Sequence, residues 1–550
     1  MRIARAVFAV LVFLLPGFAA AQAPDPAAKV DEIFAAWRSQ ESPGCTVAVA
    51  EKGRTLLSRA YGMADLEHDT QITASTVFEA GSVSKQFTAA AVLLLVQQGK
   101  LALSDDVRKY VPELPDYLPG YGRPLTIAHL IHHTGGLRDW GAVAGLHGWP
   151  RGTRIHTHAH MLDIASRQKE LNYEPGAEFS YTNTGYNLLV VIVDRVSGMS
   201  FAELTKKQIF EPLGMKHTQW RDDFTRVVKG RAIAYDKEED GFHSNMPFEN
   251  VHGNGGLLTT AEDLLLWNEN FVHGKVGGPA LIEAQQRRGR LNDGREIEYA
   301  GGLFMSTYGG LPEVSHGGAT AGYRAFLARY PDQGLSVAVL CNLGDINPED
   351  LAHRTVDLFL TGKKPDAAPA APTNMIELPA AEIVAKAGMY RNLRTGDVIQ
   401  LDLKEGKLRT RGGRAVWPLS SSLFLVENGS KLDFFAGPDG KAGMRLLTVD
   451  GDVVPHEKVA EAAPAAAQLA EYAGEYWSGE AEAAYRIVVE DGKLVAKRRP
   501  DFSAALTPLY ADGFQSEHGW LVRFTRDGNG KVSGFTFGLG RVRALRFERR

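Results

Sequence analysis

Cysteine is scarce in this chain, because Cys45 and Cys341 are the only two among 550 residues. So few cysteines exclude a small fold held by several disulfides, and also a zinc site built from cysteine ligands. A large charge of one sign is lacking too. The formal net charge is −4, which gives no reason to expect a nucleic-acid partner. The G-x-S-x-G pattern is absent, which disfavours an α/β-hydrolase.

Apolar runs of about 20 residues, the length needed to span a bilayer, are missing as well. The N-terminal run, residues 6–15, is short; it follows Arg2 and Arg5 and precedes the small residues 19–21. This order of basic, apolar and small residues predicts a secretory signal peptide over residues 1–21. No cysteine follows the run to carry a lipid. We therefore expect an exported protein, periplasmic or secreted, without a stable membrane anchor.

The stretch 78–98 carries the first candidate chemistry. Ser82 and Lys85 have the S-x-x-K spacing, which places a hydroxyl and an amine one turn apart on one helix face. Residues 87–96 are apolar at nearly every position, which predicts a helix buried on all sides. The helix N-terminus favours negative charge on the hydroxyl, and burial lowers the pKa of the lysine. The pair is a candidate activated nucleophile; a surface serine and lysine brought together by chance are the alternative.

The rest of the N-terminal part alternates between helical and extended patterns. Runs rich in β-branched residues predict strands, and apolar residues three or four apart predict helices. Loop residues interrupt a mainly helical stretch that reaches to about residue 222. The predicted strands cover 45–53, 54–64, 311–318, 323–331 and 335–343; the predicted helices cover 29–39, 185–196, 348–360 and a segment capped by Thr260.

Two groups of three histidines have spacings that suit a metal ion. Neither group has a carboxylate or cysteine partner nearby in the sequence, so we interpret both as ordinary helix-end or loop histidines and expect no metal. A metallohydrolase built on the second group is the alternative. The first group is His129, His132 and His133, and the second is His156, His158 and His160.

The C-terminal part reads as a tandem repeat. Residues 363–374 are a linker rich in Pro and Ala, and a similar break spans 461–468. The two segments that follow these breaks, 375–460 and 469–550, share short alternating strands and Gly-containing turns, which predicts two small antiparallel β-barrels. Matching pairs are Gly388-x-Tyr390 with Gly474-x-Tyr476, Gly406-Lys407 with Gly492-Lys493, and Gly440-Lys441 with Gly530-Lys531.

Three motifs with chemistry occur in a fixed order along the chain: Ser82-Val83-Ser84-Lys85, Tyr181-Thr182-Asn183 and His316-Gly317-Gly318. They resemble the serine β-lactamase and penicillin-binding-protein superfamily, particularly class C β-lactamases, D-aminopeptidases and related esterases. The resemblance implies an α/β (α+β) serine hydrolase domain over residues 22–362. Its expected features are an antiparallel sheet of five or more strands, helices on both faces and a helical subdomain. The barrels complete a D-aminopeptidase-like layout.

The resemblance also implies a role for each motif residue. Ser82 would attack a carbonyl and form an acyl-enzyme, while Lys85 and Tyr181 share the proton transfers. Tyr181 would act as a base whose pKa is lowered by nearby cations. Asn183 would hydrogen-bond Lys85 and the substrate amide. The backbone amides of Ser82 and Ala319 would form the oxyanion hole, and no cofactor is implied.

The third motif departs from the Lys-Thr/Ser-Gly of penicillin-recognising members, because it begins with His316 and Gly317. A mostly neutral imidazole without a hydroxyl beside it weakens recognition of a substrate carboxylate. Gly318 has no Cβ and would let a substrate backbone approach closely. We expect hydrolysis of a peptide, amide or ester bond in a small substrate, as in D-aminopeptidases, DD-peptidases or esterases. The alternative is a weak β-lactamase, or a penicillin-binding sensor that acylates without turnover.

Two further expectations follow from the resemblance. In the resembled sheet the first and last core strands are neighbours, so Cys45 and Cys341 should lie close together, whether or not they form a disulfide. The barrels are either spacer or binding modules, or a gate whose loop restricts substrate size at the active-site mouth. We prefer the gate, with loops 477–483 and 512–519 as candidates. The sequence leaves the oligomeric state undetermined.

Overall fold

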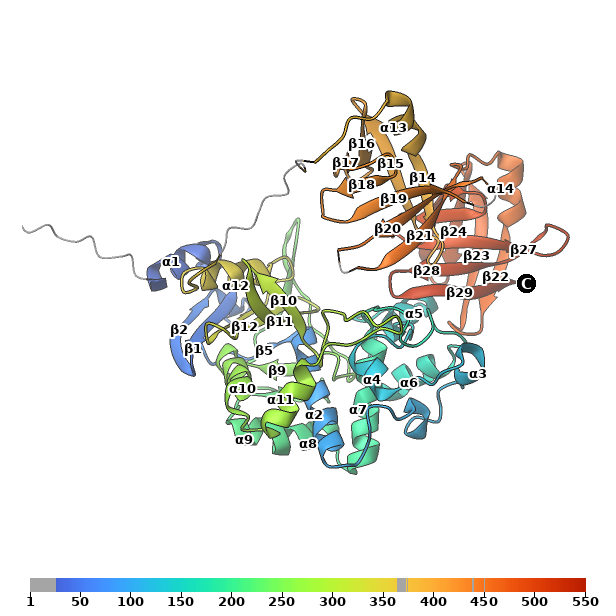
Figure 1. The fold of residues 1–550 in the computed structure, drawn as a ribbon. Helices are drawn as coiled ribbons and strands as arrows, with labels where there is room; N and C mark the ends of the chain where they lie inside the picture. The colour runs from blue at the N-terminus through green and yellow to red at the C-terminus, as the bar shows by residue number, and fades with distance from the viewer. Residues whose placement is uncertain (1–25, 364–371, 373, 438–439, 450) are drawn as a thin grey trace, which may run out of the picture.

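The computed structural model describes residues 26–363, 372, 374–437, 440–449 and 451–550. The predicted signal peptide lies outside these residues, as does most of the predicted linker at 363–374. Figure 1 shows an N-terminal unit of helices and sheet, with two β-rich units beside it, coloured orange and red. None of the helices in the described part of the chain has both the length and the apolar character needed to cross a bilayer.

A six-stranded antiparallel sheet forms the centre of the N-terminal unit, in the order β10-β11-β12-β13-β1-β2. The central strands are apolar at almost every position because both faces of the sheet are covered. The expected antiparallel sheet of five or more strands is confirmed. Its strands are β1 (Cys45–Glu51), β2 (Arg54–Tyr61), β10 (Phe304–Tyr308), β11 (Leu311–Thr320), β12 (Tyr323–Tyr330) and β13 (Leu335–Cys341).

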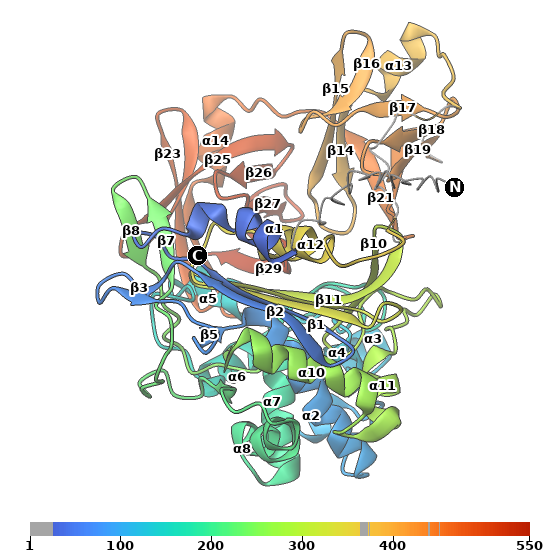
Figure 2. The same cartoon turned by 90° about the vertical axis from the view of Figure 1, so that its left-hand side faces the viewer.

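Helices cover both faces of this sheet, as Figure 2 shows. On one face lie α1 (Pro26–Ile33) and α12 (Pro348–Val356), and on the other α2 (Lys85–Gln97) and α10 (Ala261–His273). Alternate residues of β1 serve the two cores: Val47 and Val49 pack in the cluster of α1 and α12, whereas Ala48 and Ala50 pack in the cluster of α2. The predicted helix 29–39 ends at Ile33 and continues as a 3-10 turn, Ala35–Trp37.

The remaining helices of this unit form a subdomain around α2, which is buried on all sides as predicted. They are α3 (Leu118–Tyr121), α4 (Ile127–Ile131), α5 (Trp140–His147), α6 (His158–Ser166), α7 (Asn183–Ser197), α8 (Phe201–Thr205), α9 (Glu211–Leu213) and α11 (Gly278–Gln286). The small strands are β3 (Met63–Asp65), β4 (Thr70–Gln71), β5 (Phe78–Glu79), β6 (Gln219–Trp220), β7 (Tyr235–Glu238), β8 (Gly241–Ser244) and β9 (Leu257–Thr259).

Cys45 and Cys341 face each other across the neighbouring strands β1 and β13. Their Cα atoms are 4.0 Å apart, both side chains are fully buried, and the two sulfurs form a disulfide. The predicted proximity is confirmed. The bond joins the first strand of the sheet to its last, across 296 residues of sequence.

Each β-rich unit has eight antiparallel strands, in keeping with the predicted pair of antiparallel β modules, and each begins with a short helix that we did not predict. The second unit is a closed barrel; the first is an open sheet whose edge strands meet through a bridge between Arg409 and Ala415. The first consists of α13 (Ala380–Lys386), β14 (Gly388–Asn392), β15 (Val398–Lys404), β16 (Lys407–Thr410), β17 (Val416–Pro418), β18 (Leu423–Val426), β19 (Lys431–Ala436), β20 (Ala442–Leu447) and β21 (Val453–Val459). The second consists of α14 (Ala466–Tyr472), β22 (Gly474–Ser478), β23 (Ala483–Glu490), β24 (Lys493–Arg498), β25 (Phe502–Tyr510), β26 (Gly513–Ser516), β27 (Leu521–Arg526), β28 (Val532–Leu539) and β29 (Val542–Arg549).

The matched glycines of the repeat lie at equivalent turns of the two units. Gly406 and Gly492 join the second strand of each unit to the third, and Gly440 and Gly530 join the sixth to the seventh. Their φ angles lie between +73° and +77°, a backbone region that glycine adopts without steric cost. The tight turns between strands therefore explain why glycine recurs at these positions.

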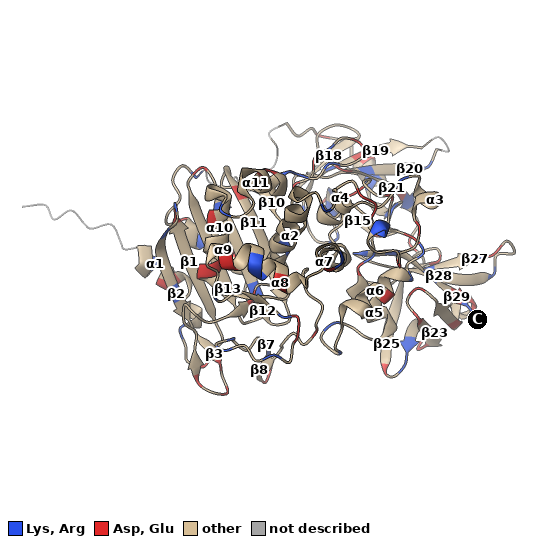
Figure 3. Cartoon of the chain, turned by 90° about the horizontal axis from the view of Figure 1, so that it is seen from below, with Lys and Arg blue, Asp and Glu red and all other residues tan. Residues whose placement is uncertain are grey.

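The second barrel is docked on the N-terminal unit rather than suspended from a linker. Arg138 pairs with Glu480 at 2.7 Å, and both side chains are almost fully buried. The break at 461–468, which we expected to be a flexible linker, is held in place: the Ala462 amide donates to the carbonyl of Leu509, and α14 begins within the break. Acidic and basic residues are interspersed over all three parts of the chain in the view from below (Figure 3).

Candidate active site

Ser82 lies in a short 3-10 turn, Gly81–Ser84, that leads directly into α2. We expected Ser82 in the first turn of one continuous helix, but the structure separates the turn from the α-helix, which starts at Lys85. The strand pair β5–β9 holds the turn, because the Ala80 amide donates to the carbonyl of Leu257 at 2.8 Å. Ser82 is half-buried and lines a cavity.

Lys85 is fully buried, and its amine lies among three oxygens. Nζ is 3.1 Å from Ser82 Oγ, 3.0 Å from Asn183 Oδ1 and 2.7 Å from the carbonyl oxygen of Asn254. A neutral amine has two hydrogens and one lone pair. The amide and carbonyl oxygens can only accept, so they take both hydrogens, and the lone pair is left for the hydroxyl proton of Ser82.

The surroundings of Lys85 favour this neutral form. Burial lowers the pKa of its amine well below the ordinary value, and the positive charges of Arg541 and Arg151 lower it further. Asp139 acts in the opposite direction, with a smaller effect. The predicted activation of a buried lysine is therefore consistent with this arrangement.

Asn254 belongs to the site although the sequence indicated only a loop at Asn254-Gly255-Gly256. Its backbone carbonyl is the oxygen nearest to Lys85 Nζ. The loop is fixed at both sides: Asn187 Nδ2 donates to Asn254 Oδ1 at 2.7 Å, and the Gly256 amide donates to Glu79 Oε1 at 3.1 Å. A backbone carbonyl leaves no side-chain signature, which explains why the sequence could not reveal it.

Asn183 is the first residue of α7, two residues earlier than the predicted helix start, and Thr182 caps it. The Asn183 amide donates to Asp139 Oδ2 at 2.8 Å, so the carboxylate fixes the start of the helix. Because the side-chain oxygen of Asn183 accepts from Lys85, its NH₂ group is the part that faces the cavity. The structure thus brings Asn183 to Lys85, as the resemblance implies.

Tyr181 lies above Lys85, with the amine 4.7 Å from the centre of its ring. The expectation of a lowered pKa is wrong. Burial raises the pKa of this hydroxyl and outweighs Ser82 and Arg541, which lower it. The hydroxyl is buried and has no hydrogen-bond partner among the described residues. Tyr181 is therefore a neutral proton donor in the unliganded site, and Lys85 is the better base.

Two glycines bring the predicted oxyanion-hole amides together. A Cβ on Gly318 would lie 2.1 Å from the carbonyl oxygen of Ala80 and 3.1 Å from the Ser82 nitrogen; one on Gly81 would lie 2.6 Å from the Ala319 nitrogen. Strand β10 pairs with β11 only up to Ser315, so the last part of β11 is free to pack on the Ser82 turn. We expected Gly318 to admit a substrate backbone, but its missing Cβ admits the nucleophile's own turn.

His316 has both ring nitrogens occupied within the protein. Nδ1 lies 2.6 Å from the carbonyl oxygen of Gly317, which can only accept, so Nδ1 carries the hydrogen. Nε2 lies 3.1 Å from the hydroxyl of Tyr299, which therefore donates to it. Burial, together with the charge of Lys85, lowers the pKa of His316 to about 3. The ring is neutral and has no nitrogen left for a substrate, contrary to the role we predicted.

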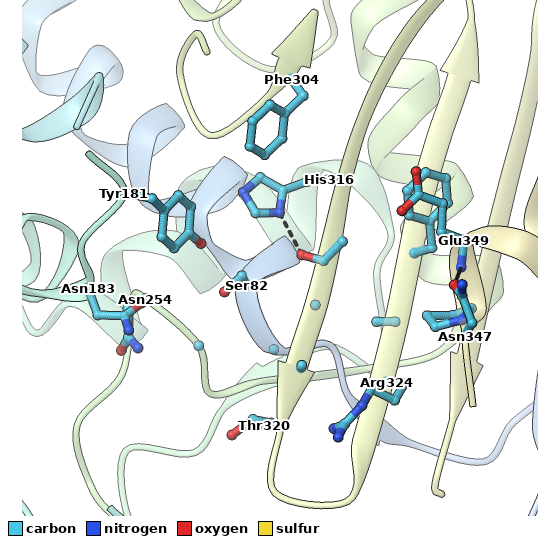
Figure 4. A pocket seen from close by; sticks show the side chains of 18 of the residues that line it. Ser82, Tyr181, Asn183, Asn254, Phe304, His316, Thr320, Arg324, Asn347 and Glu349 are labelled. Carbon is cyan, nitrogen blue, oxygen red and sulfur yellow. Dashed lines mark hydrogen bonds between the residues drawn. The ribbon is translucent and has the colours of Figure 1, made fainter. Parts of the chain in front are cut away.

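Ser82, Tyr181, Asn183 and His316 line one cavity of about 650 Å³, in the size range of small-molecule sites. Figure 4 shows Ser82, Tyr181 and His316 close together beside β11, with Asn183 and Asn254 to the left of Ser82. Arg541 of the second barrel also lines this cavity, on the turn between β28 and β29. Sequence reasoning missed Arg541, although five arginines crowd the last ten residues.

The two loops that we named as gates lie elsewhere. Loop 477–483 does dock on the N-terminal unit, but through Glu480 and Arg138, and none of its residues lines the cavity. In loop 512–519, Asp512 pairs with Arg526 of its own barrel. The turn Gly540-Arg541 is the part of the barrel that reaches the cavity.

Histidines of both groups form hydrogen bonds to backbone groups of the protein. In the described part of the chain, neither group gathers three ligand atoms within 4.8 Å of one another. His129 Nδ1 accepts from the Thr126 amide at the start of α4. His158 Nε2 lies 3.2 Å from the carbonyl of His252, and His156 Nε2 lies 3.0 Å from that of Trp149. These contacts give no geometric support to a metallohydrolase.

Comparison with known proteins finds relatives over most of this chain. The Brucella melitensis D-aminopeptidase is 26% identical over 538 residues, covering 93% of this chain and 96% of the relative. The octameric penicillin-binding protein homologue from Pyrococcus abyssi has the same fold, with a TM-score of 0.55 and 23% identity over 87% of this chain and 98% of its own. A D-amino acid amidase from Ochrobactrum anthropi superposes with a TM-score of 0.51 and 20% identity, covering 60% of this chain and 98% of its own.

The family model "Beta-lactamase" matches residues 28–361. That range contains the strand pair with the disulfide, the Ser82 turn, Tyr181 and the third motif. It leaves both β-rich units outside, and the D-aminopeptidase relatives span those as well. The Ser82–Lys85 pair lies within the matched range, and the chain is a serine hydrolase that belongs to the β-lactamase family.

Proposed function

We propose that this protein hydrolyses a peptide or amide bond in a small substrate through an acyl-enzyme on Ser82, as a D-aminopeptidase- or DD-peptidase-like enzyme. The observation that carries the proposal is the environment of Lys85. Two fixed acceptors, Asn183 Oδ1 and the carbonyl of Asn254, use both hydrogens of its neutral amine. Its lone pair is thereby directed at Ser82 Oγ, 3.1 Å away.

In the acylation step, the Ser82 proton moves to Lys85 Nζ while Oγ attacks the substrate carbonyl carbon. The oxyanion that forms is received by the amides of Ser82 and Ala319, which the packing of Gly81 on β11 holds side by side. Tyr181 then donates its hydroxyl proton to the departing nitrogen, because it is neutral and its hydroxyl has no partner among the described residues. Lys85 restores that proton, and water releases the acyl group by the reverse route.

The relatives and the cavity support a small peptide or amide as substrate. The aligned relative named D-aminopeptidase covers both β-rich units as well as the site. A cavity of about 650 Å³ is in the size range of small-molecule sites and can hold a short peptide. Arg541, on the turn after Gly540, borders this cavity. The second barrel therefore limits substrate length, which is the gating role that we predicted for loops 477–483 and 512–519.

We also propose that the protein is exported to the periplasm or secreted. The N-terminal pattern of residues 1–21 supports this. The Cys45–Cys341 disulfide is an independent support, because such bonds persist mainly in oxidising compartments.

A substrate screen tests the proposed reaction. Purified protein would be offered D- and L-aminoacyl anilides, acyl dipeptides, short-chain esters and a chromogenic cephalosporin, with Ser82→Ala as the control. Steady turnover of an anilide or peptide, absent in Ser82→Ala, is the expected result. A single burst without turnover would instead identify a penicillin-binding sensor that acylates but does not hydrolyse, and equal hydrolysis by Ser82→Ala would reject the serine mechanism.

A further inference from the structure

Arg541 is held rigidly at the cavity by its backbone. Its carbonyl accepts from the Asp139 amide at 3.2 Å and from Asn172 Nδ2 at 3.0 Å. Both donors belong to the N-terminal unit, and Asp139 also fixes the amide of Asn183. The position of the Arg541 side chain is therefore coupled to the same segment that positions the catalytic amide.

The guanidinium of Arg541 is free of hydrogen bonds to the described residues, unlike its neighbours at the same interface. Arg543 donates to Glu178 at 2.8 Å, Arg546 to Glu170 at 2.6 Å, and Arg498 to the carbonyl of Leu146. The guanidinium of Arg541 instead lies 4.9 Å from the centre of the Tyr181 ring, and its side chain is 48% exposed. Its five N–H donors are available to a bound ligand.

Few carboxylates are available to neutralise this cation. Asp139 Oδ2 is 3.9 Å away, beyond hydrogen-bond distance. That carboxylate is 7% exposed and already accepts from the amides of Gly141, Ala142 and Asn183. Arg151, another residue of the cavity wall, is paired with Glu249.

Asp139 and Glu249 do not line the cavity, and the acidic residue of its described wall is Glu349, in the first turn of α12. Figure 4 places Glu349 across β11 from Tyr181. Because the Arg541 guanidinium lies over the Tyr181 ring, Glu349 is on the opposite side of the cavity from Arg541. A substrate with a free α-ammonium group would meet the cation of Arg541 near Ser82 without a free carboxylate beside it. The charge on this side of the cavity suits an anion.

The third motif does not compete for this role. His316 is neutral, and its two nitrogens are bonded to Gly317 and Tyr299. Arg324 on β12 also lines the cavity, but it donates to the backbone carbonyls of Ala321 and Tyr323. A carboxylate near Ser82 would therefore find its free cation on the second barrel rather than on β11 or β12. Arginine is well suited, because its planar fork binds a carboxylate through two parallel hydrogen bonds.

We propose that Arg541 is the anion-binding residue of this active site, and that the substrates carry a carboxylate close to the scissile bond rather than a free amine. This substrate class rests on the proposed function, and it separates this enzyme from one that selects an amino-terminal ammonium group. The cation is supplied by the C-terminal barrel, so substrate recognition requires the docked barrel.

Binding to the Ser82→Ala full chain, measured by calorimetry, tests the charge preference without any need for turnover. Three ligands share one skeleton: acetyl-D-alanyl-D-alanine is anionic, its C-terminal amide is neutral, and D-alanyl-D-alaninamide is cationic. We expect the anion to bind at least about tenfold more tightly than the neutral amide, and the cation to bind weakest. Arg541→Gln should remove this preference, and Arg541→Lys should retain part of it.

Arg546→Gln is the matched control, because Arg546 lies on β29 at the same interface but does not line the cavity. It should leave the order of the three affinities unchanged. Equal binding of the three ligands, undetectable binding of the anion, or an unchanged preference in Arg541→Gln would each overturn the proposal. Hydrolysis of the same peptide by wild-type protein is measured separately. Preferential binding of the anion without hydrolysis would count against the proposed function and leave the anion site standing.

Discussion

Gly318 on β11 packs so closely against Ala80 that a Cβ on the glycine would lie 2.1 Å from the Ala80 carbonyl oxygen. The strand and the nucleophile turn therefore touch backbone to backbone. This contact sets the distance between the amides of Ser82 and Ala319. It links the third motif to the first through packing rather than through a shared hydrogen bond.

Gly318→Ala should therefore disable the site. The new methyl group meets backbone rather than a flexible side chain, so the strand and the turn must separate and the oxyanion hole widens. We expect a loss of at least about 10²-fold in acylation rate, the size of effect seen when one oxyanion donor is lost. Gly317→Ala is the matched control, because its Cβ would meet its nearest atom at 3.9 Å. Similar rates for the two variants would contradict this reading of the contact.

The pH dependence of acylation should report the pKa of Lys85. Its amine must be neutral to accept the Ser82 proton, so the rate should rise with pH through that pKa and then level off. Arg541 lowers this pKa. Arg541→Gln should therefore raise it and move the rising limb to higher pH, which labelling rates with a phosphonate probe would measure. A rising part of the profile that stays at the same pH, or moves to lower pH, would argue against Lys85 as the base. Arg546→Gln is the control and should leave the profile unchanged.

Tyr181→Phe removes the proposed proton donor and keeps the ring that packs against Lys85 and Arg541. We expect the acylation rate with an amide substrate to fall by about 10²-fold or more, as for other acid–base groups. An activated ester needs little help in expelling its leaving group and should be affected less. Stopped-flow acylation with a matched amide and ester checks this, and equal losses for both would point to a positioning role for the hydroxyl.

Glu480→Gln tests the docking of the second barrel. Arg138 would keep its charge in an almost fully buried position without its partner, and breaking such pairs costs about 3–5 kcal/mol. The Arg546–Glu170 pair is exposed, so Arg546→Gln should cost only about 0–1 kcal/mol. Urea unfolding of the full chain compares the two midpoints. A larger shift for Arg546→Gln than for Glu480→Gln would mean that the barrel is held mainly by other contacts.

Much of the fold and of the site followed from local sequence patterns. Ser82 and Lys85 were predicted because helical spacing brings i and i+3 onto one face, and the all-round apolar helix was predicted to be buried. The Cys45–Cys341 contact followed from the strand order that the resemblance implies. The glycines of the repeat marked turns that both β-rich units share.

The errors concern features set by packing between distant segments. The pKa of Tyr181 rises because burial outweighs the neighbouring cations, and the extent of burial cannot be read from a loop sequence. Arg541 lies on an ordinary hairpin turn, and only the docking of the barrel brings it to Tyr181. The Tyr299 hydroxyl, which donates a hydrogen bond to His316 Nε2, belongs to none of the three motifs. These three corrections change which groups move protons and which group recognises charge.

The most direct test of the central claim is the site of covalent modification by a fluorophosphonate probe. Intact-mass analysis should show one adduct per wild-type chain, and peptide analysis should place that adduct on Ser82. Lys85→Ala should label at least about 10²-fold more slowly, and Ser82→Ala should not label. An adduct on another residue, or labelling of Ser82→Ala at the wild-type rate, would contradict the assignment of Ser82 as the nucleophile.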